Sequence, residues 1–177
     1  MTNDCPDLES VRFFATQYKE MDPTAVMAFI AVMRLSHNAT QAMAGYFQKM
    51  DLSHSGFMVM MVLCRFPAGE VTPAHLADKL SISRASISSL LDTLEAKDWV
   101  KRQPDPDDRR SCVILLTAAG KAKLDSILPG HYQRIAQMMA DISESDRETF
   151  VEICKRLNQR VTAFGEQDQP VLEKAGK

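Results

Sequence analysis

The amino-acid sequence predicts a mainly α-helical fold with one small β-hairpin. Over most of the 177 residues, apolar side chains recur every three or four positions, which is the spacing of an amphipathic helix. Between Trp99 and Gly120, by contrast, two apolar runs flank a tip of Pro, Asp and Arg. With 45% hydrophobic and 25% charged residues, the chain is typical of a globular protein with its own core.

The hairpin is predicted from two extended runs on either side of turn-forming residues. Val100 to Arg102 and Cys112 to Leu116 are the apolar runs, and Pro104 to Asp108 supply the turn. Arg109 and Arg110 follow in a loop with little apolar material, so their charge is held in solvent. Such a tip is either an ordinary solvated turn or a positively charged group that reaches the anionic groove of a binding partner. The residues before the hairpin favour the second interpretation.

Two short helices joined by a tight turn are predicted directly before the hairpin. Thr72 can cap the first helix, with Pro73 at the first helical position, where the missing amide proton costs nothing. The turn falls at Ser81 to Ser83, and the last of these serines can cap the second helix. The apolar stripe of the second helix consists of Ile87, Leu90, Leu91 and Leu94.

The outward face of the second helix is small and polar near its N-terminus. Small hydroxyl side chains let a helix enter the DNA major groove, and the positive helix N-terminus attracts phosphates. Helix, turn, helix and hairpin together predict a winged helix-turn-helix, with the hairpin as its wing. The residues of the outward face are Arg84, Ala85, Ser86, Ser88 and Ser89.

At these residues the chain resembles the MarR family, the multiple-antibiotic-resistance type of bacterial transcriptional regulators. The family pattern has a Thr-Pro-x-x-Leu-Ala helix start, a Leu-Glu-x-x-Gly-x-Val helix end and an Asp-x-Arg wing closing on Leu-Thr-x-x-Gly. Asp98 stands where the family has Gly, and Asp tolerates the left-handed conformation needed there. Ser89 stands where many relatives carry Arg. The matching residues are Thr72-Pro73, Leu76-Ala77, Leu94-Glu95, Val100, Asp108, Arg110, Leu116-Thr117 and Gly120.

The resemblance implies a homodimeric repressor that binds double-stranded DNA and is released by a small aromatic or anionic effector. A two-fold dimer sets two recognition helices about 34–36 Å apart on a pseudo-palindromic operator. In the family the wing arginine enters the minor groove, which assigns Arg110 as the reader and Asp108 as its orienting partner. The expected DNA-binding residues are Thr72, Ser83, Arg84, Ala85, Ser86, Ser88, Ser89, Lys101, Arg102, Asp108, Arg109 and Arg110.

The net charge of the predicted DNA-binding region is close to zero. From Glu70 to Thr117 there are seven cations and eight anions, and the whole chain has a net charge of −2. Affinity for DNA must therefore come from the placement of cations on one face rather than from bulk charge. The near-neutral region also supports an alternative, a winged helix used for protein–protein assembly.

The N-terminal part of the chain is predicted to be helical. A short helix is expected from Leu8 to Tyr18, and Asp22-Pro23 opens a long helix that ends near Met50. Ser53 or Ser55 caps the next helix. Its run from Phe57 to Cys64 is apolar on every side and is therefore expected to be buried.

The C-terminal part is predicted to form two more helices. Thr117 caps a helix through Met139 that Pro129-Gly130 should kink, and a last helix runs from after Asp141 to about Phe164. The predicted organisation is an N-terminal segment with a dimerisation helix (1–50), the DNA-binding lobe (51–117), C-terminal dimerisation helices (118–164) and a polar tail (165–177).

The residues expected to line an effector pocket also have a second interpretation. Methionine and aromatic side chains can form an adaptable wall, but they also fill gaps in the core of any helix bundle. The one histidine of the set, His37, either contacts an effector or lies in an interface. The candidate pocket residues are Met33, His37, Phe57, Met60 and Met61.

Several classes of function are not indicated by the sequence. No nucleophile, base and orienting group occur together, so no catalytic residue is assigned, and no His or Cys spacing predicts a metal or other cofactor. The sequence shows neither a membrane span nor a secretion signal, so we expect a cytoplasmic protein. Reduced thiols are the default, with a thiol-oxidation sensor of the same family as an alternative. The cysteines are Cys5, Cys64, Cys112 and Cys154.

Overall fold

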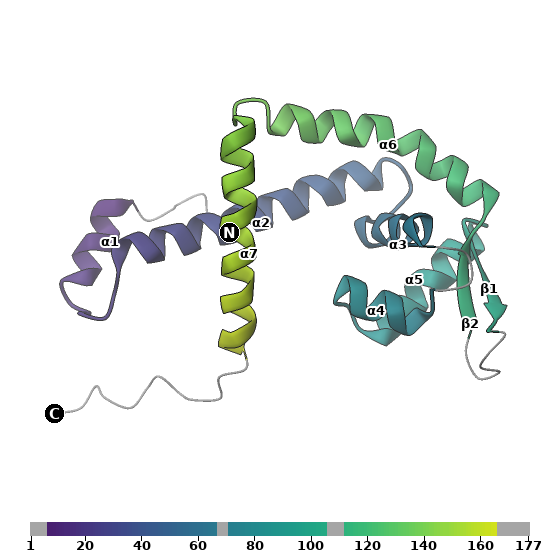
Figure 1. Ribbon diagram of the computed structural model, residues 1–177, viewed down its shortest axis with the longest axis horizontal. Coiled ribbons are helices and arrows are strands. Elements are labelled where there is room, and N and C mark those ends of the chain that lie inside the picture. Colours follow the sequence, from purple (N-terminus) through teal and green to yellow (C-terminus); the bar gives the residue numbers. More distant parts are fainter. Residues whose placement is uncertain (1–6, 67–70, 106–111, 166–177) are drawn as a thin grey trace. The chain divides into compact units, whose positions relative to one another are not determined.

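The computed structural model describes residues 7–66, 71–105 and 112–165 of the chain. It divides into two compact units, Met1–Ile127 and Leu128–Lys177. The described residues form seven helices and one two-stranded antiparallel sheet (Figure 1). The prediction of a mainly α fold with a small hairpin is confirmed.

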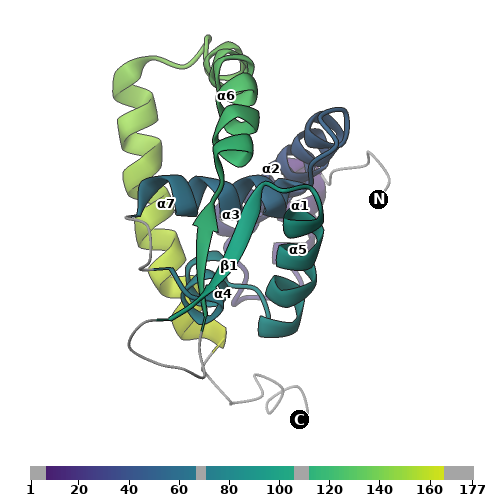
Figure 2. The same cartoon turned by 90° about the vertical axis from the view of Figure 1, so that its right-hand side faces the viewer.

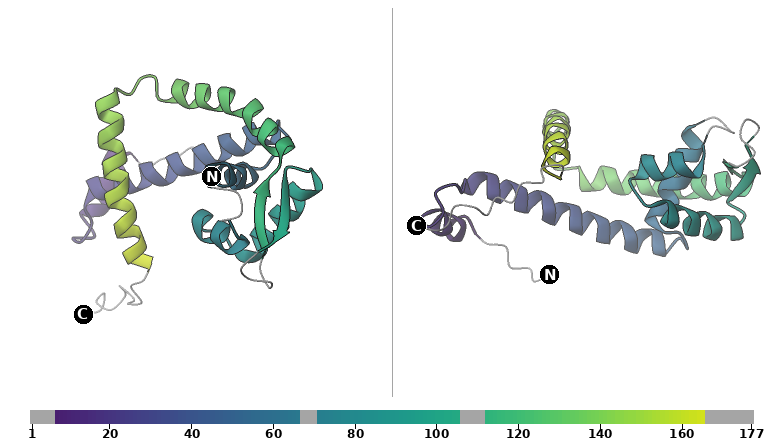
Figure 3. Two further views of the ribbon diagram at one scale, coloured as in Figure 1. Left: turned by 45° about the vertical axis from the view of Figure 1, so that its right-hand side comes forward. Right: turned by 90° about the horizontal axis from the view of Figure 1, so that it is seen from below.

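The first two helices of the first unit each have an aspartate as the N-cap residue. Asp7 caps α1 (Leu8–Ala15) and Asp22 caps α2 (Pro23–Gln48), each by accepting hydrogen bonds from backbone N–H groups of the first turn. Helix α2 extends from α1 to a lobe (Figure 3) formed by α3 (His54–Arg65), α4 (Pro73–Leu80), α5 (Arg84–Ala96) and the hairpin. Of its 26 residues, Phe47 alone is buried. The expected short and long N-terminal helices are both present, but the short helix ends at Ala15 and not at Tyr18.

Helix α3 (His54–Arg65) is capped by Ser53, whose hydroxyl accepts a hydrogen bond from the Gly56 N–H at 2.9 Å. Its side chains differ from the expected uniform burial. Met60 is fully buried, but Met58 is 37% exposed and Cys64 is also exposed. The expectation was wrong for these two residues because α2, α4, α5 and the hairpin do not cover the whole circumference of α3.

The helix-turn-helix has the caps expected from its sequence. Thr72 caps α4 (Pro73–Leu80) through the His75 N–H, and Ser83 caps α5 (Arg84–Ala96) through the Ser86 N–H. Between the helices, Ser81 has a left-handed backbone, with φ of 53°. Asp98 after α5 is also left-handed, with φ of 56°, so aspartate does adopt the conformation for which the family uses glycine.

The wing is a hairpin of β1 (Val100–Pro104) and β2 (Cys112–Leu116), with Val100 paired to Leu116 and Pro104 to Cys112. Pro104 was expected in the turn but ends the first strand, where the pairing does not require its missing N–H. Figure 2 shows the hairpin beside α5. The Ile114 N–H donates to the Val71 carbonyl at 2.7 Å, which ties β2 to the segment preceding α4.

The core of the lobe is apolar and closed. Every element of the lobe contributes a side chain that is at most 1% exposed, and two side chains from the flanking helices, Phe47 and Leu124, are fully buried as well. The large side chains of this core are Val59, Met60, Val71, Leu76, Ile87, Leu91, Leu94, Val100 and Ile114.

Two helices follow the wing. Thr117 caps α6 (Ala118–Met138): its hydroxyl accepts from the Gly120 N–H and donates to the Asp98 carbonyl. Helix α6 is continuous through Pro129. Ser143 caps α7 (Glu144–Gly165) through the Asp146 N–H, and no described side chain of α7 is buried. No helix among the described residues has the length and apolar character to cross a membrane.

Candidate nucleic-acid interface

Helix α5 has three distinct faces, and this division positions the candidate site. Ile87, Leu91 and Leu94 form the buried face. Ser88, Asp92 and Glu95 lie one turn apart on a second face, which receives the Arg102 side chain from the wing. The third face is exposed and carries Ala85, Ser86 and Ser89, which the sequence predicted as DNA contacts.

The exposed face of α5 borders an open groove of about 670 Å³. Ala85, Ser86 and Ser89 line it, and Arg84 is exposed at the start of the same helix. The sequence analysis missed three further hydroxyl residues of this groove. The capping serines at the start of α3 were a signal for two of them, since a helix N-terminus presents hydroxyl and N–H groups together. The three are Ser53, Ser55 and Thr93.

Two predicted contact residues have an identified local role. The Thr72 hydroxyl accepts from the His75 N–H at 3.2 Å, and the Ser83 hydroxyl accepts from the Ser86 N–H at 3.1 Å. The Ser83 and Ser86 hydroxyls also lie 2.8 Å apart. These bonds fix the N-termini of α4 and α5, so both residues position the helices of the candidate interface.

The cations of the first wing strand face different surroundings. Lys101 is exposed, whereas the Arg102 guanidinium binds the carboxylates of Asp92, at 2.6 Å, and Glu95. We call Arg102, Asp92 and Glu95 the wing clamp. Burial lowers the pKa of Arg102, but the hydrogen bonds that it donates to the two carboxylates and the attraction of their negative charges together raise it by more, so the guanidinium stays charged.

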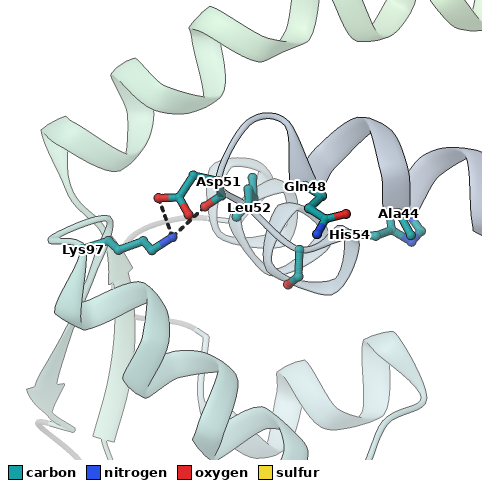
Figure 4. Close-up of a pocket in the computed structure, with 7 residues that line it drawn as sticks. Ala44, Gln48, Asp51, Leu52, His54 and Lys97 are labelled. Atoms are coloured by element: carbon teal, nitrogen blue, oxygen red, sulfur yellow. Dashed lines mark hydrogen bonds and ion pairs between the residues drawn. The ribbon is translucent and has the colours of Figure 1, made fainter.

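The end of α5 is tied to the turn between α2 and α3. Lys97 donates to the Asp51 carbonyl at 2.6 Å and pairs with its carboxylate at 2.8 Å (Figure 4). The hydrogen bond from Lys97 and its positive charge lower the pKa of the Asp51 carboxyl. These two residues border an open pocket of about 420 Å³. The Lys97 ammonium also lies 4.9 Å from the centre of the Trp99 ring.

The five residues expected to form an effector pocket are not brought together within one chain. Phe57 and Met60 are buried in the lobe, and Phe57 stacks on Phe47 with ring centres 4.4 Å apart. Met33 and His37 are exposed on α2. At about 1.5 Å per residue they lie roughly 15–20 Å along the helix from Phe47. Met61 is half-buried.

Some predicted site residues lie outside the described part of the chain, namely Asp108, Arg109 and Arg110 of the wing tip and also Cys5. Of the other cysteines, Cys64 is exposed, and Cys112 and Cys154 are half-buried. Within the described ranges, no three His, Cys, Asp or Glu side chains are grouped as metal ligands would be.

Comparison with known proteins shows similarity to one family of regulators. The family model described as the MarR family matches residues 50–111, which include α3, α4, α5 and the first wing strand. The repressor YetL of Bacillus subtilis is 29% identical over 159 residues, covering 90% of this chain and 95% of that protein. Over this region the chain is similar to the MarR family. Members of that family are transcriptional regulators and not enzymes, and the predicted resemblance to the family is confirmed.

Solved structures of MarR regulators share the fold. A MarR family transcription regulator superimposes with a TM-score of 0.72 at 18% identity, covering 86% of this chain and 98% of that one. A mutant of Escherichia coli MarR in complex with operator DNA gives a TM-score of 0.67 at 20% identity, covering 76% of this chain and 95% of that one. The predicted winged helix with flanking helices is therefore confirmed as the fold.

Proposed function

We propose that this MarR-family regulator is a homodimeric repressor that binds a pseudo-palindromic operator with α5 and the wing, and that a small anionic or aromatic effector releases it. The exposed face of α5 carries the proposal. That face is small and hydroxyl-rich, stands beside the wing, and begins at a capped helix N-terminus with an exposed arginine, Arg84. Such a surface fits the major groove.

The contacts divide into two classes. Arg84 and Lys101 are exposed cations suited to phosphates. Ala85, Ser86 and Ser89 line the groove on the outward face and are suited to base edges. At the wing tip, which lies outside the described residues, we propose that Arg110 reads the minor groove with Asp108 as its orienting partner. Arg109 and Ser88 complete the proposed surface.

The dimer is supported by the uncovered apolar side chains of α2 and α7. On α2, Phe29 and Met33 are more than half exposed, at 54% and 56%. A stripe at helical spacing on α7 is also exposed, and the acidic residues of this helix lie in its first half, whereas its basic residues other than Arg147 lie in the second half. An antiparallel pair of α7 helices would match apolar with apolar and acid with base. The exposed stripe of α7 includes Phe150, Ile153, Val161 and Phe164.

The proposed effector acts by preferring one spacing of the two lobes. A ligand shifts a population only as far as its affinity differs between the two states, so it must contact residues whose separation changes. Met33 and His37 on α2 are exposed in one chain, and we propose that a second chain completes the pocket around them. The alternative, release by thiol oxidation, is favoured by the exposure of Cys64.

A binding experiment with two variants tests the proposal. Arg84→Ala and Arg110→Ala should each weaken operator binding by about 1–3 kcal/mol while leaving the dimer intact, because each removes an exposed contact. The loss for Arg110→Ala should be larger on A·T-flanked than on G·C-flanked operators. Fluorescence anisotropy measures the affinity and sedimentation the dimer. Full affinity in both variants, or no preference of the parent protein for palindromic over random duplex, would favour a protein-binding winged helix.

A further inference from the structure

The wing clamp is a charged cluster that the proposed DNA contacts do not use. The Arg102 guanidinium binds Asp92 and Glu95, and its Nη2 also donates to the Ser88 carbonyl at 3.4 Å. The three acceptors stand at positions i, i+4 and i+7 of α5, so the arginine side chain follows one side of the recognition helix over two turns. One side chain of the wing therefore contacts much of the length of α5.

The geometry of the clamp requires an arginine. Glu95 binds Arg102 twice: Oε1 accepts from the Arg102 backbone N–H at 3.0 Å, and Oε2 accepts from the guanidinium. The planar guanidinium reaches two carboxylates and a carbonyl at once, which an ammonium on a flexible stem does not do. The bond to the backbone fixes the position of β1, and the bonds to the guanidinium fix its orientation relative to α5.

Stability of the lobe does not account for this arrangement. The Asp92 and Glu95 side chains are 66% and 38% exposed, and ion pairs at exposed sites contribute little to the free energy of unfolding. The core beneath is made by apolar residues such as Leu91 and Leu94. Moreover, two carboxylates on a recognition helix repel phosphates, so on electrostatic grounds alone they oppose DNA binding.

We propose that the wing clamp is a positioning device for operator binding, in which Arg102 sets the wing relative to α5 through Asp92 and Glu95 and is not itself a DNA ligand. This inference rests on the proposed function, in which α5 and the wing contact DNA together. The clamp holds β1 two residues before its end at Pro104, and the turn with Arg109 and Arg110 follows in the sequence. A change in the direction of β1 would therefore change where the proposed contacts Arg109 and Arg110 meet the DNA.

The direction in which one substitution changes operator affinity distinguishes a positioning role from a purely electrostatic one. Asp92→Asn removes a negative charge from the DNA-binding helix, so a through-space effect would tighten operator binding. Loss of the clamp instead predicts affinity weakened by about 3- to 10-fold. Arg102→Lys keeps the charge but loses the planar fork, and it should weaken binding to a similar extent. Unchanged or tighter binding by Asp92→Asn, measured by fluorescence anisotropy, would overturn the proposal.

The salt dependence of binding shows whether Arg102 contacts phosphate. Lys101→Gln, on the neighbouring exposed cation, calibrates the measurement, because loss of one phosphate contact lowers the slope of log affinity against log salt by about one. For Arg102→Gln we expect weaker binding with the slope of the parent protein. A slope reduced as much as in Lys101→Gln would make Arg102 a DNA ligand and refute the positioning role.

A third readout needs no DNA and so distinguishes failure of this proposal from failure of the proposed function. Hydrogen exchange of the strand Val100–Pro104, followed by mass spectrometry in the free full-length protein, should be faster in Arg102→Gln and Asp92→Asn, and unchanged in Lys101→Gln. Unchanged exchange in both clamp variants rejects the clamp. Faster exchange in a protein whose parent form shows no operator preference supports the clamp and rejects the proposed function.

Discussion

The winged-helix lobe and the long helices α2 and α7 differ in how much apolar surface one chain covers. In the lobe, Ile87 and Leu76 are fully buried, and short helices and a hairpin close around them. In α2 only Phe47 is buried, at the end that meets the lobe. In α7 no described side chain is buried, and Phe164 is 76% exposed. The lobe is a complete core, whereas the long helices present apolar faces that one chain leaves open.

This difference indicates which part of the molecule depends on a partner. Burial of apolar surface contributes about 25 cal/mol per Å² and is the main favourable term in folding and association. The lobe gains this term from its own sequence, so its shape does not need a second chain. In the proposed dimer, the helices α2 and α7 gain it only by pairing, which would make their arrangement dependent on protein concentration and accessible to an effector.

Deletion of α7 should produce the largest effect. A chain ending before Ser143 loses the exposed apolar stripe of this helix, and we expect a monomer or an aggregate. Operator affinity should fall by about 100-fold or more, because one lobe loses the gain from linking two half-sites. Sedimentation velocity and gel-shift titration measure the two effects. The matched control ends after Gly165 and should remain dimeric; a dimeric truncation before Ser143 would contradict the assignment of α7.

Matched core and surface substitutions should separate the two regions. Leu91→Ala, in the closed core, should lower the free energy of unfolding by about 2–5 kcal/mol. Because the lobe is complete in one chain, that loss should not vary with protein concentration. Ile153→Ala, on α7 and 45% exposed in one chain, should instead weaken the dimer. Thermal unfolding over a range of concentrations tests both. A concentration-independent effect of Ile153→Ala would mean that α7 is not an interface.

The close contact behind Gly120 offers a third test of the lobe. A Cβ at this position would overlap the Trp99 carbonyl oxygen, which is backbone and cannot rotate away. Gly120→Ala should therefore cost about 1–3 kcal/mol by overpacking where α6 meets the wing. Gly45→Ala, on the open side of α2 with no atom within 4 Å, should leave stability unchanged or raise it. Equal melting temperatures for Gly120→Ala and the parent protein would contradict the close contact.

Local chemistry made much of the lobe predictable from sequence. The Thr72 and Ser83 hydroxyls accept hydrogen bonds from N–H groups three residues later in the chain. The sequence predicts such caps wherever a hydroxyl residue precedes an apolar stripe at helical spacing. The left-handed Asp98 could be expected from the family pattern. Gly120 belonged to the same pattern, but its reason, the Trp99 carbonyl, depends on contact between two elements and became visible only in the structure.

Long-range pairing was the part that sequence reasoning did not predict. The sequence predicted Arg102 as a DNA-binding cation of the wing. Its binding to Asp92 and Glu95 depends on how β1 lies against α5. The uniform apolar run of α3 predicted burial without showing which side would lie open, so Met58 was misplaced. Spacing within one element gives its faces, whereas the surroundings of each face come from other elements.

The smallest expected effect concerns the tie between α2 and the lobe. Because the hydrogen bond and charge of Lys97 lower the pKa of Asp51 below its ordinary 3.8, the ionised carboxylate stabilises the folded state. That contribution is complete above pH 3.8 and is lost as pH falls through the lower folded pKa. Asp51→Asn is a matched variant, since Asn also tolerates the left-handed backbone at this position, where φ is 55°.

We therefore expect Asp51→Asn to lower the melting temperature slightly at neutral pH and to converge on the parent protein in acid. The Asp51 side chain is 85% exposed, so added salt should reduce the difference by screening. In a Lys97→Gln background the same substitution should have little effect, because the partner of the carboxylate is gone. Melting temperatures of the four proteins, measured between neutral and acidic pH, give the coupling. A difference that grows toward low pH would have the opposite sign and would show that the pair does not stabilise the folded chain.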